Sequence, residues 1–178
     1  MYNIRMLMKI IEQNGLYFVT GIKDVVISVG GQFNDYKERP IVALLKSNEN
    51  PDIFWAVPLG NLEHRDDEKT KRIQRYLDCP KEDIRSCFYH IGTTTQKSIF
   101  FVSDVFPINS DYIAREYLTF NSRHYIIKNP QLLSELNEKL RRILAYEQSK
   151  IKQTGRFFFR QNIFGVYDKI KMTEDNDK

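Results

Sequence analysis

Residues 39–61 read RPIVALLKSNENPDIFWAVPLGN and decide the fold of this 178-residue chain. Two apolar runs of strand length, residues 41–45 and 53–59, flank the polar segment 48–52. Asn, Asp and Pro are typical turn residues, and two short apolar runs around a polar turn are typical of an antiparallel hairpin. This stretch therefore predicts a β-hairpin at the centre of the fold.

Shorter segments on the N-terminal side of the hairpin predict further strands. Residues 17–19 and 24–29 are rich in β-branched and aromatic residues, which favour strands. Gly30 and Gly31 mark a turn after them. Residues 6–11 fit a first strand and a short helix about equally well.

Downstream of the hairpin, helix and strand patterns alternate. Ile73, Tyr76 and Leu77 recur at helical spacing inside a charged segment. We therefore expect a helix in the second half of residues 63–77. Strands are expected at residues 86–92 and 98–102, with a turn between them at residues 93–97. Residues 104–108 are then expected to leave the sheet, and residues 111–117 to form a short helix.

A long amphipathic helix is predicted over residues 130–152. Asn129 is a typical N-cap, Pro130 suits the first turn, and Gly155 is a natural stop. Apolar residues recur at helical spacing on one face, namely Leu132, Leu133, Leu136, Leu140, Ile143, Leu144 and Ile151. The aromatic residues 157–164 that follow favour a strand or an extended packing arm.

Together these patterns predict an α+β fold with a small, curled, mostly antiparallel sheet and two or three helices. We expect one domain over residues 1–171 and a disordered polar tail over residues 172–178.

Charge is distributed unevenly along the chain. Lys and Arg number 27 against 23 Asp and Glu, a net charge of +4. Residues 139–171 hold nine of these bases and only two acids, so that the rest of the chain is net acidic. This asymmetry indicates an anionic partner, RNA or DNA first, although a solvated helix face produces the same pattern.

Several classes of protein are excluded by what the sequence lacks. Two cysteines, Cys79 and Cys87, cannot make a disulfide scaffold or a zinc site of four cysteines. We find no phosphate-binding loop, dinucleotide fingerprint or zinc-protease motif, and we expect no cofactor and no metal. The start carries charges inside its apolar stretch, and no apolar run suits a membrane helix, so that we expect a cytoplasmic protein without a membrane partner.

Three short motifs, in order, resemble a known family. Arg39-Pro40 opens an apolar strand, its partner ends in Val-Pro-Leu at residues 57–59, and Phe-Pro-Ile at residues 106–108 precedes the long basic helix. This order resembles the ribonuclease toxins of bacterial type III toxin–antitoxin systems (the ToxN/AbiQ, CptN and TenpN group), which are similar to the MazF/PemK toxins. The resemblance covers most of residues 36–152, with Gly60-Asn61 where the family often has Thr-Ser.

The resemblance implies a small SH3-like barrel and an endoribonuclease that needs no metal. Cleavage by attack of the ribose 2′-OH leaves a 2′,3′-cyclic phosphate and a 5′-OH. The resemblance also implies a toxin with a role in phage defence. Its partners would be an RNA substrate and an antitoxin, a small structured RNA bound along a basic groove, in some members within a closed ring assembly.

Metal-free cleavage needs a base, an acid and cations near the phosphate. Two histidines lie at predicted strand ends beside groups that bind phosphate, so that the candidate catalytic residues are His64, Arg65, His90, Lys97 and Ser98. The alternative is that one histidine is a solvated loop residue and the other a structural strand residue.

Candidate RNA-binding residues are the cations outside the apolar faces, namely Arg39, Lys69, Lys71, Arg72, Arg142, Lys150, Lys152 and Arg156. The alternative for the cations near residue 70 is an ordinary salt-bridged surface, because three acids precede them. A second function therefore stays open, a non-catalytic nucleic-acid-binding or interaction module that uses the basic C-terminal surface.

Overall fold

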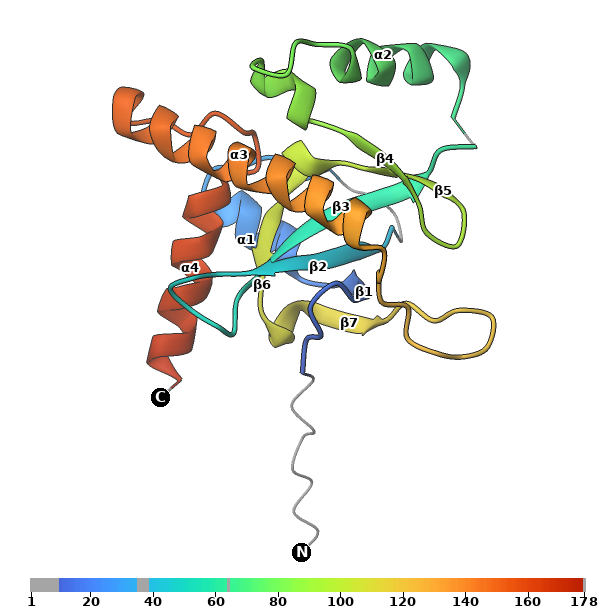
Figure 1. Cartoon of the computed structure of the whole chain (residues 1–178). Helices are drawn as coiled ribbons and strands as arrows, with labels where there is room; N and C mark the ends of the chain where they lie inside the picture. The colour runs from blue at the N-terminus through green and yellow to red at the C-terminus, as the bar shows by residue number, and fades with distance from the viewer. Residues whose placement is uncertain (1–9, 35–38, 64, 178) are drawn as a thin grey trace, which may run out of the picture.

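The computed structural model describes residues 10–34, 39–63 and 65–177. Across these residues the fold is α+β, with seven strands and four α-helices (Figure 1). In chain order they are β1 (Leu16–Val19), α1 (Ile22–Ser28), β2 (Ile41–Lys46), β3 (Phe54–Asn61), α2 (Asp67–Leu77), β4 (His90–Thr93), β5 (Lys97–Phe100), β6 (Phe106–Ile108), β7 (Ile113–Glu116), α3 (Pro130–Thr154) and α4 (Ile163–Asn176). Three 3-10 turns complete the list, η1 (Ile84–Cys87), η2 (Val102–Asp104) and η3 (Ser110–Tyr112).

The predicted hairpin is confirmed and forms the middle of the sheet. β2 and β3 pair antiparallel, and the strand order is β4-β5-β3-β2-β1-β7. The other edge of β3 pairs with β6 along its first half and with β5 along its second half. Within the described residues β4 and β7 do not pair, so the sheet is open and a closed barrel is not confirmed.

One face of the sheet is covered by the two C-terminal helices. Trp55 of β3 stacks on Tyr167 of α4, with ring centroids 5.5 Å apart. Gly92 of β4 lies so close to α3 that a Cβ there would be 2.5 Å from Leu132. Figure 1 shows α3 crossing in front of the strands, with α4 beside them. Helix α3 therefore closes this face over a core that includes Leu136.

The caps predicted for the long helix are confirmed. The side-chain oxygen of Asn129 accepts hydrogen bonds from the backbone N–H groups of Gln131 and Leu132. Pro130 occupies the first turn, and Gly155 ends the helix with a left-handed φ of 69°. Local chemistry thus sets both ends of α3.

The first helix replaces a predicted strand. Residues 24–29 were expected to be extended, but residues 22–28 form α1. Ile22 and Val26 are both buried and lie four residues apart, which is helical spacing. Burial of this pair outweighs the strand preference of the β-branched residues.

The C-terminal segment holds this helix in place. The side-chain amide of Asn162 donates to the carbonyl of Val29 over 2.8 Å, and the backbone N–H of Gln32 donates to the carbonyl of Arg160 over 2.7 Å. Two segments more than a hundred residues apart in sequence are therefore joined directly.

Further expectations are wrong. Residues 104–108 do not leave the sheet, since β6 pairs with β3, and residues 111–117 form η3 and β7 instead of a helix. Residues 86–92 begin in η1 and are extended only from His90. Residues 157–162 do not form a strand. The tail over residues 172–178, expected to be disordered, is helical through Asn176 because α4 continues into it.

The described residues form four α-helices, where two or three were expected. Residues 6–9 of the expected first strand or helix lie outside the described residues.

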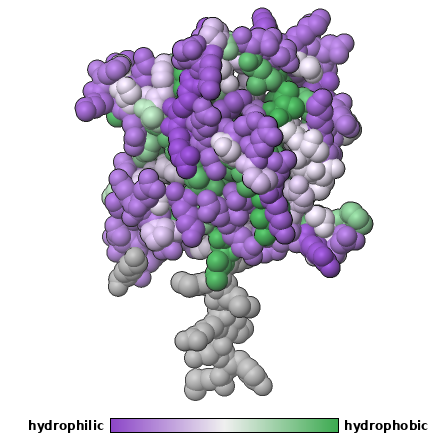
Figure 2. All heavy atoms as spheres, viewed as in Figure 1, coloured by the Kyte–Doolittle hydropathy of each residue, from purple (hydrophilic) through white to green (hydrophobic). Residues whose placement is uncertain are grey.

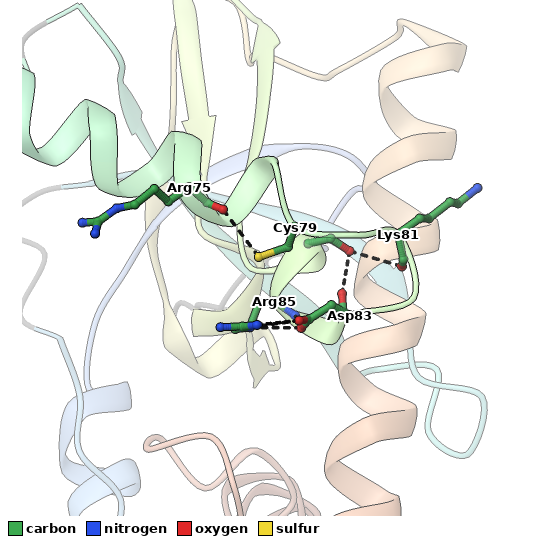
Figure 3. A network of polar contacts seen from close by, with 6 residues as sticks. Arg75, Cys79, Lys81, Asp83 and Arg85 are labelled. Carbon is green, nitrogen blue, oxygen red and sulfur yellow. Dashed lines mark hydrogen bonds and ion pairs between the residues drawn. The ribbon is translucent and has the colours of Figure 1, made fainter.

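A polar turn connects α2 back to the sheet (Figure 3). The thiol of Cys79 donates to the carbonyl of Arg75 over 3.4 Å, at the end of the helix. The Arg85 guanidinium donates to both carboxylate oxygens of Asp83, and the hydroxyl of Ser86 donates to the carbonyl of Lys81. These contacts fix the path from α2 into η1, which packs against α3.

The face of the molecule drawn in Figure 2 is mostly hydrophilic, with apolar residues in narrow strips. Among the described residues, no helix has both the length and the apolar character needed to cross a membrane.

Candidate functional site

Two arginines meet at the end of β3, on the sheet face opposite α3. The guanidinium carbons of Arg39 and Arg65 lie 5.5 Å and 4.8 Å from the centroid of the Phe101 ring, within the range of cation–π contacts. A Cβ on Gly60 would lie 3.4 Å from a guanidinium nitrogen of Arg65 and 3.6 Å from that ring. We call Arg39, Arg65, Phe101 and Gly60 the arginine cluster.

Asn61 holds the loop that carries Arg65. Its side-chain oxygen accepts from the backbone N–H of Glu63 over 2.8 Å, and its amide nitrogen donates to the side chain of Gln96 over 3.0 Å. The backbone N–H of Leu62 donates to the carbonyl of Lys97 over 3.0 Å. The loop after β3 is thus tied to the β4–β5 turn, which places Lys97 beside the start of that loop.

A cavity of about 360 Å³ continues from the arginine cluster along the same face of β3. Ile22, Ile41, Pro58 and Phe106 form its buried apolar floor, and we call it the β1–β7 cavity. Because side chains two residues apart on a strand share a face, Pro58 in this cavity and Gly60 in the cluster lie on one continuous surface.

Cations surround the mouth of the β1–β7 cavity. Lys23, Arg39 and Arg115 line it, and its described lining residues include no Asp or Glu. The Arg115 guanidinium lies 3.8 Å from the centroid of the Phe18 ring. Arg39 belongs both to this cavity and to the arginine cluster, and it therefore joins the two.

His90 lies on the other face of the sheet, beneath α3. Its Nε2 is 3.0 Å from a carboxylate oxygen of Glu135, and its side chain is only 12% exposed. Burial lowers the pKa of His90, the cation of Lys139 lowers it further, and Glu135 opposes both effects. Lys139 itself donates to the carbonyl of Tyr89 over 2.8 Å. This is a packed environment, and the register of β4 separates His90 from the arginine cluster.

Ser98 is also a structural residue. It is 2% exposed, and its hydroxyl lies 2.8 Å from that of Thr94 and donates to the carbonyl of Gln96 over 3.1 Å. Ser98 pairs with Gly92, which faces α3, so its side chain lies on the same side as His90. Among the five candidate catalytic residues, Arg65 and Lys97 are the two whose segments are joined directly, through the backbone hydrogen bond from Leu62 to Lys97.

His64 lies outside the described residues. Its neighbours in sequence are Glu63, held by Asn61, and Arg65 of the arginine cluster. Of the predicted RNA-binding residues, Arg39 belongs to this cluster.

The bases near residue 70 lie on α2, whose buried residue Ile73 packs with Phe101 of the arginine cluster. Lys69, Lys71 and Arg72 line a shallow groove together with Glu68 and Asp78. Lys69 also makes an exposed ion pair of 3.7 Å with Asp66. The groove is mixed in charge, as expected of a solvated helix surface.

The bases of α3 do not form one stripe. The ammonium of Lys150 lies 5.3 Å from the ring centroid of Tyr146, whereas Lys152 lines a different hollow together with Asp168 of α4. Arg142 lies about 80° around the helix axis from each of these two lysines, because successive helical residues are rotated by about 100°. Arg156 is exposed just past the helix end.

Two of the residues that line the β1–β7 cavity were not identified from the sequence. Arg115 fell in a predicted helix, and Lys23 lay next to a predicted strand. Residues 113–116 read Ile-Ala-Arg-Glu and lack the alternation of apolar and polar residues that could have indicated β7.

The site can hold an anion and stack a flat group. Guanidinium groups bind phosphate oxygens, and aromatic rings stack on bases. Among the described residues, no group of three or more His, Cys, Asp or Glu could hold a metal ion. No model of a known protein family matches the chain, and no curated protein matches it either.

Proposed function

We propose that the protein is an endoribonuclease toxin that binds RNA at the arginine cluster and cleaves it without a metal ion. The observation that supports this most directly is that the guanidinium groups of Arg39 and Arg65 both lie against the Phe101 ring, next to a loop that is joined to the β4–β5 turn at Lys97. Two guanidinium groups close together favour a phosphodiester and the negative charge that develops on it during cleavage.

The proposed chemistry is an internal transesterification. The ribose 2′-OH attacks the adjacent phosphorus and loses its proton to a base, while the 5′-oxygen leaves and takes a proton from an acid. His64 is the proposed proton-transfer residue, because His90 is packed under α3 and Arg65 is next in sequence to His64. Arg39, Arg65 and Lys97 would hold the phosphate.

The wider setting follows from the sequence resemblance. In this proposal the protein acts on cytoplasmic RNA, and a small structured antitoxin RNA restrains it, in a higher-order assembly if it follows the ring-forming members. Its sheet would correspond to the curled SH3-like sheet of those toxins. The bases of α3 and Arg156 would contact the antitoxin.

The test is a cleavage assay in EDTA with mixed RNA and analysis of the product ends. We expect 2′,3′-cyclic phosphate ends, and we expect His64→Ala and Arg65→Gln to reduce cleavage at least about a hundredfold. The matched control is His90→Gln, which should keep cleavage near the wild-type rate under conditions where it is folded. Intact RNA would overturn the proposed cleavage, and a salt-sensitive gel shift of that intact RNA would favour the binding module.

A further inference from the structure

The β1–β7 cavity combines an apolar interior with a cationic mouth. Phe18, Val19 and Phe33 form its walls above the buried floor. The Phe33 ring is fixed at one end, since it packs edge-on against Phe106 with centroids 5.6 Å apart. This combination suits a ligand that has a flat apolar part and a negative charge.

The size of the cavity suits one such group. Its volume of about 360 Å³ lies near the lower end of the range for small-molecule pockets. An unstacked base packs on aromatic rings, and the cavity offers one in Phe33, beside the cation of Arg115.

A bulge shapes the wall that carries Arg115. Phe18 pairs with Arg115 and Val19 with Ile113, so that β7 has one extra residue, Ala114, at the cavity. Bulges bend a strand and change the direction of its side chains. Here the bulge accompanies the close contact of Arg115 with Phe18.

The cavity also has a fixed spacing from the arginine cluster. Pro58 and Gly60 are separated by about 7 Å, because a strand rises about 3.4 Å per residue. Arg39 lies between the two sites and touches both. A strand whose phosphate lies at the arginine cluster can therefore place a neighbouring base in the cavity.

We infer that the β1–β7 cavity binds one unstacked nucleotide of a single RNA strand, with the base against Phe33 and the phosphate at Arg39 and Arg115. This inference rests on the proposed function for the identity of the strand. A base bound in the cavity would determine which nucleotide of the RNA lies at the arginine cluster.

The first experiment measures binding alone, with the full chain and with nucleoside 5′-monophosphates and inorganic phosphate as probes. We expect mononucleotides to shift the backbone amide resonances of Phe18, Thr20 and Ala114, and to bind at least about tenfold more tightly than phosphate, because base stacking adds to the charge contact. Equal affinity for both probes, or shifts elsewhere, would overturn the inference.

Two variants and a control test the residues. Arg115→Gln is exposed and should fold, and we expect it to weaken mononucleotide binding about fivefold. Phe33→Leu keeps apolar volume but removes the ring, and we expect a loss of about tenfold. Arg123→Gln changes the net charge equally, outside the cavity, and should leave the affinity unchanged. A loss as large in Arg123→Gln would show that only overall charge matters.

A second experiment separates this inference from the proposed function. Short RNA strands with an abasic site at each position in turn are bound to the His64→Ala variant, which cannot cleave them in our proposal. One position should weaken binding about tenfold in this variant, and that difference should vanish when Phe33→Leu is added. An equal effect at every position would overturn the cavity inference while leaving cleavage standing. Mononucleotide binding in a protein that cleaves no RNA would overturn the proposed function alone.

Discussion

Glu147 is a charged residue without exposed surface, at 0% exposure in the middle of α3. Its carboxylate accepts the backbone N–H groups of Phe158 and Phe159, over 3.0 Å and 2.9 Å. Burial raises the pKa of Glu147, and the two N–H donors oppose that rise. The side chain thus fastens the segment after α3 back onto the helix at an electrostatic cost.

Because burying the Glu147 carboxylate is unfavourable, we expect the free energy of unfolding to depend on pH. Because the folded protein binds this proton more tightly than the unfolded chain, the stability linked to Glu147 is greatest below its ordinary pKa and falls as the pH rises through the higher folded value. We expect Glu147→Gln to lack this fall, as shown by unfolding free energies at about pH 4.5 and about pH 7.5. A wild-type protein that loses no more stability than the variant over this interval would contradict the prediction.

Removing the acceptor altogether has a different result. Glu147→Ala leaves two N–H donors without their acceptor, and we expect a loss of about 1–3 kcal/mol for the buried donor at Phe159 alone. Denaturant unfolding at neutral pH measures this loss, and Glu147→Gln is the matched variant that keeps an acceptor. Equal stability of the two variants would show that the hydrogen bonds contribute little.

For His90 we expect the free energy of unfolding to change with pH in the opposite direction. Burial and Lys139 lower the pKa of His90, so the neutral form is favoured in the folded protein. The stability linked to His90 is present above the ordinary pKa of about 6.5 and is lost as the pH falls through the lower folded value. We expect His90→Gln to lose less stability than the wild type between about pH 7.5 and about pH 5.5. Equal losses of stability in the two proteins would show that the attraction of Glu135 fully offsets the effects of burial and Lys139 on the pKa of His90.

At the scale of elements, the start of α3 depends on one side chain. Asn129 satisfies two N–H groups that have no partner within the helix. We expect Asn129→Ala to lower the unfolding free energy by about 1 kcal/mol and Asn129→Asp to retain it, since both Asn and Asp cap helices well. Thermal and denaturant unfolding of the two variants side by side measure the difference, and an alanine variant as stable as the aspartate variant would show that the cap is dispensable.

The elements that the sequence predicts correctly are those with local signals. The β2–β3 hairpin follows from two apolar runs and a polar turn, and α3 follows from its caps and periodicity. β7 and β6 have no comparable signal, because each is three or four residues long and is a strand only through pairing with a distant partner. α1 was missed because the burial of Val26 depends on the fold around it.

The candidate site, like the fold, could be predicted from the sequence only where it depends on local features of the chain. Arg39 and Arg65 follow from their places beside the hairpin, which is a local feature of the chain. The separation of His90 and Ser98 from them depends on the register of β4 and β5, since a shift of one residue would reverse the face of each side chain. No sequence pattern fixes that register here.

At the scale of the whole molecule, two groups of cations lie on opposite faces of the sheet. The arginine cluster is on one face, and α3 with Arg142 and Lys150 covers the other. The two groups can therefore be altered separately, and the proposed function assigns a different RNA to each.

Two double variants with equal loss of charge test it. We expect Arg39→Gln with Arg65→Gln to reduce the salt dependence of binding to a short single strand by about 1.4 in slope, since each phosphate contact contributes about 0.7. Arg142→Gln with Lys150→Gln should leave that slope unchanged and reduce it only for a folded RNA hairpin. Fluorescence anisotropy over a series of salt concentrations measures both, and equal slopes for the two variants would show that the protein binds RNA through its overall charge.

The contact of α1 with the segment before α4 has a consequence for synthesis on the ribosome. Val29 and Gln32 leave the exit tunnel well before their partners Asn162 and Arg160 are translated. At roughly 5–20 residues per second, the interval is on the order of ten seconds. During this time α1 lacks these two contacts, so the wall that it gives the β1–β7 cavity gains them only after Arg160 and Asn162 have been synthesised. Under the proposed function, RNA binding in this cavity would begin only after that point of synthesis.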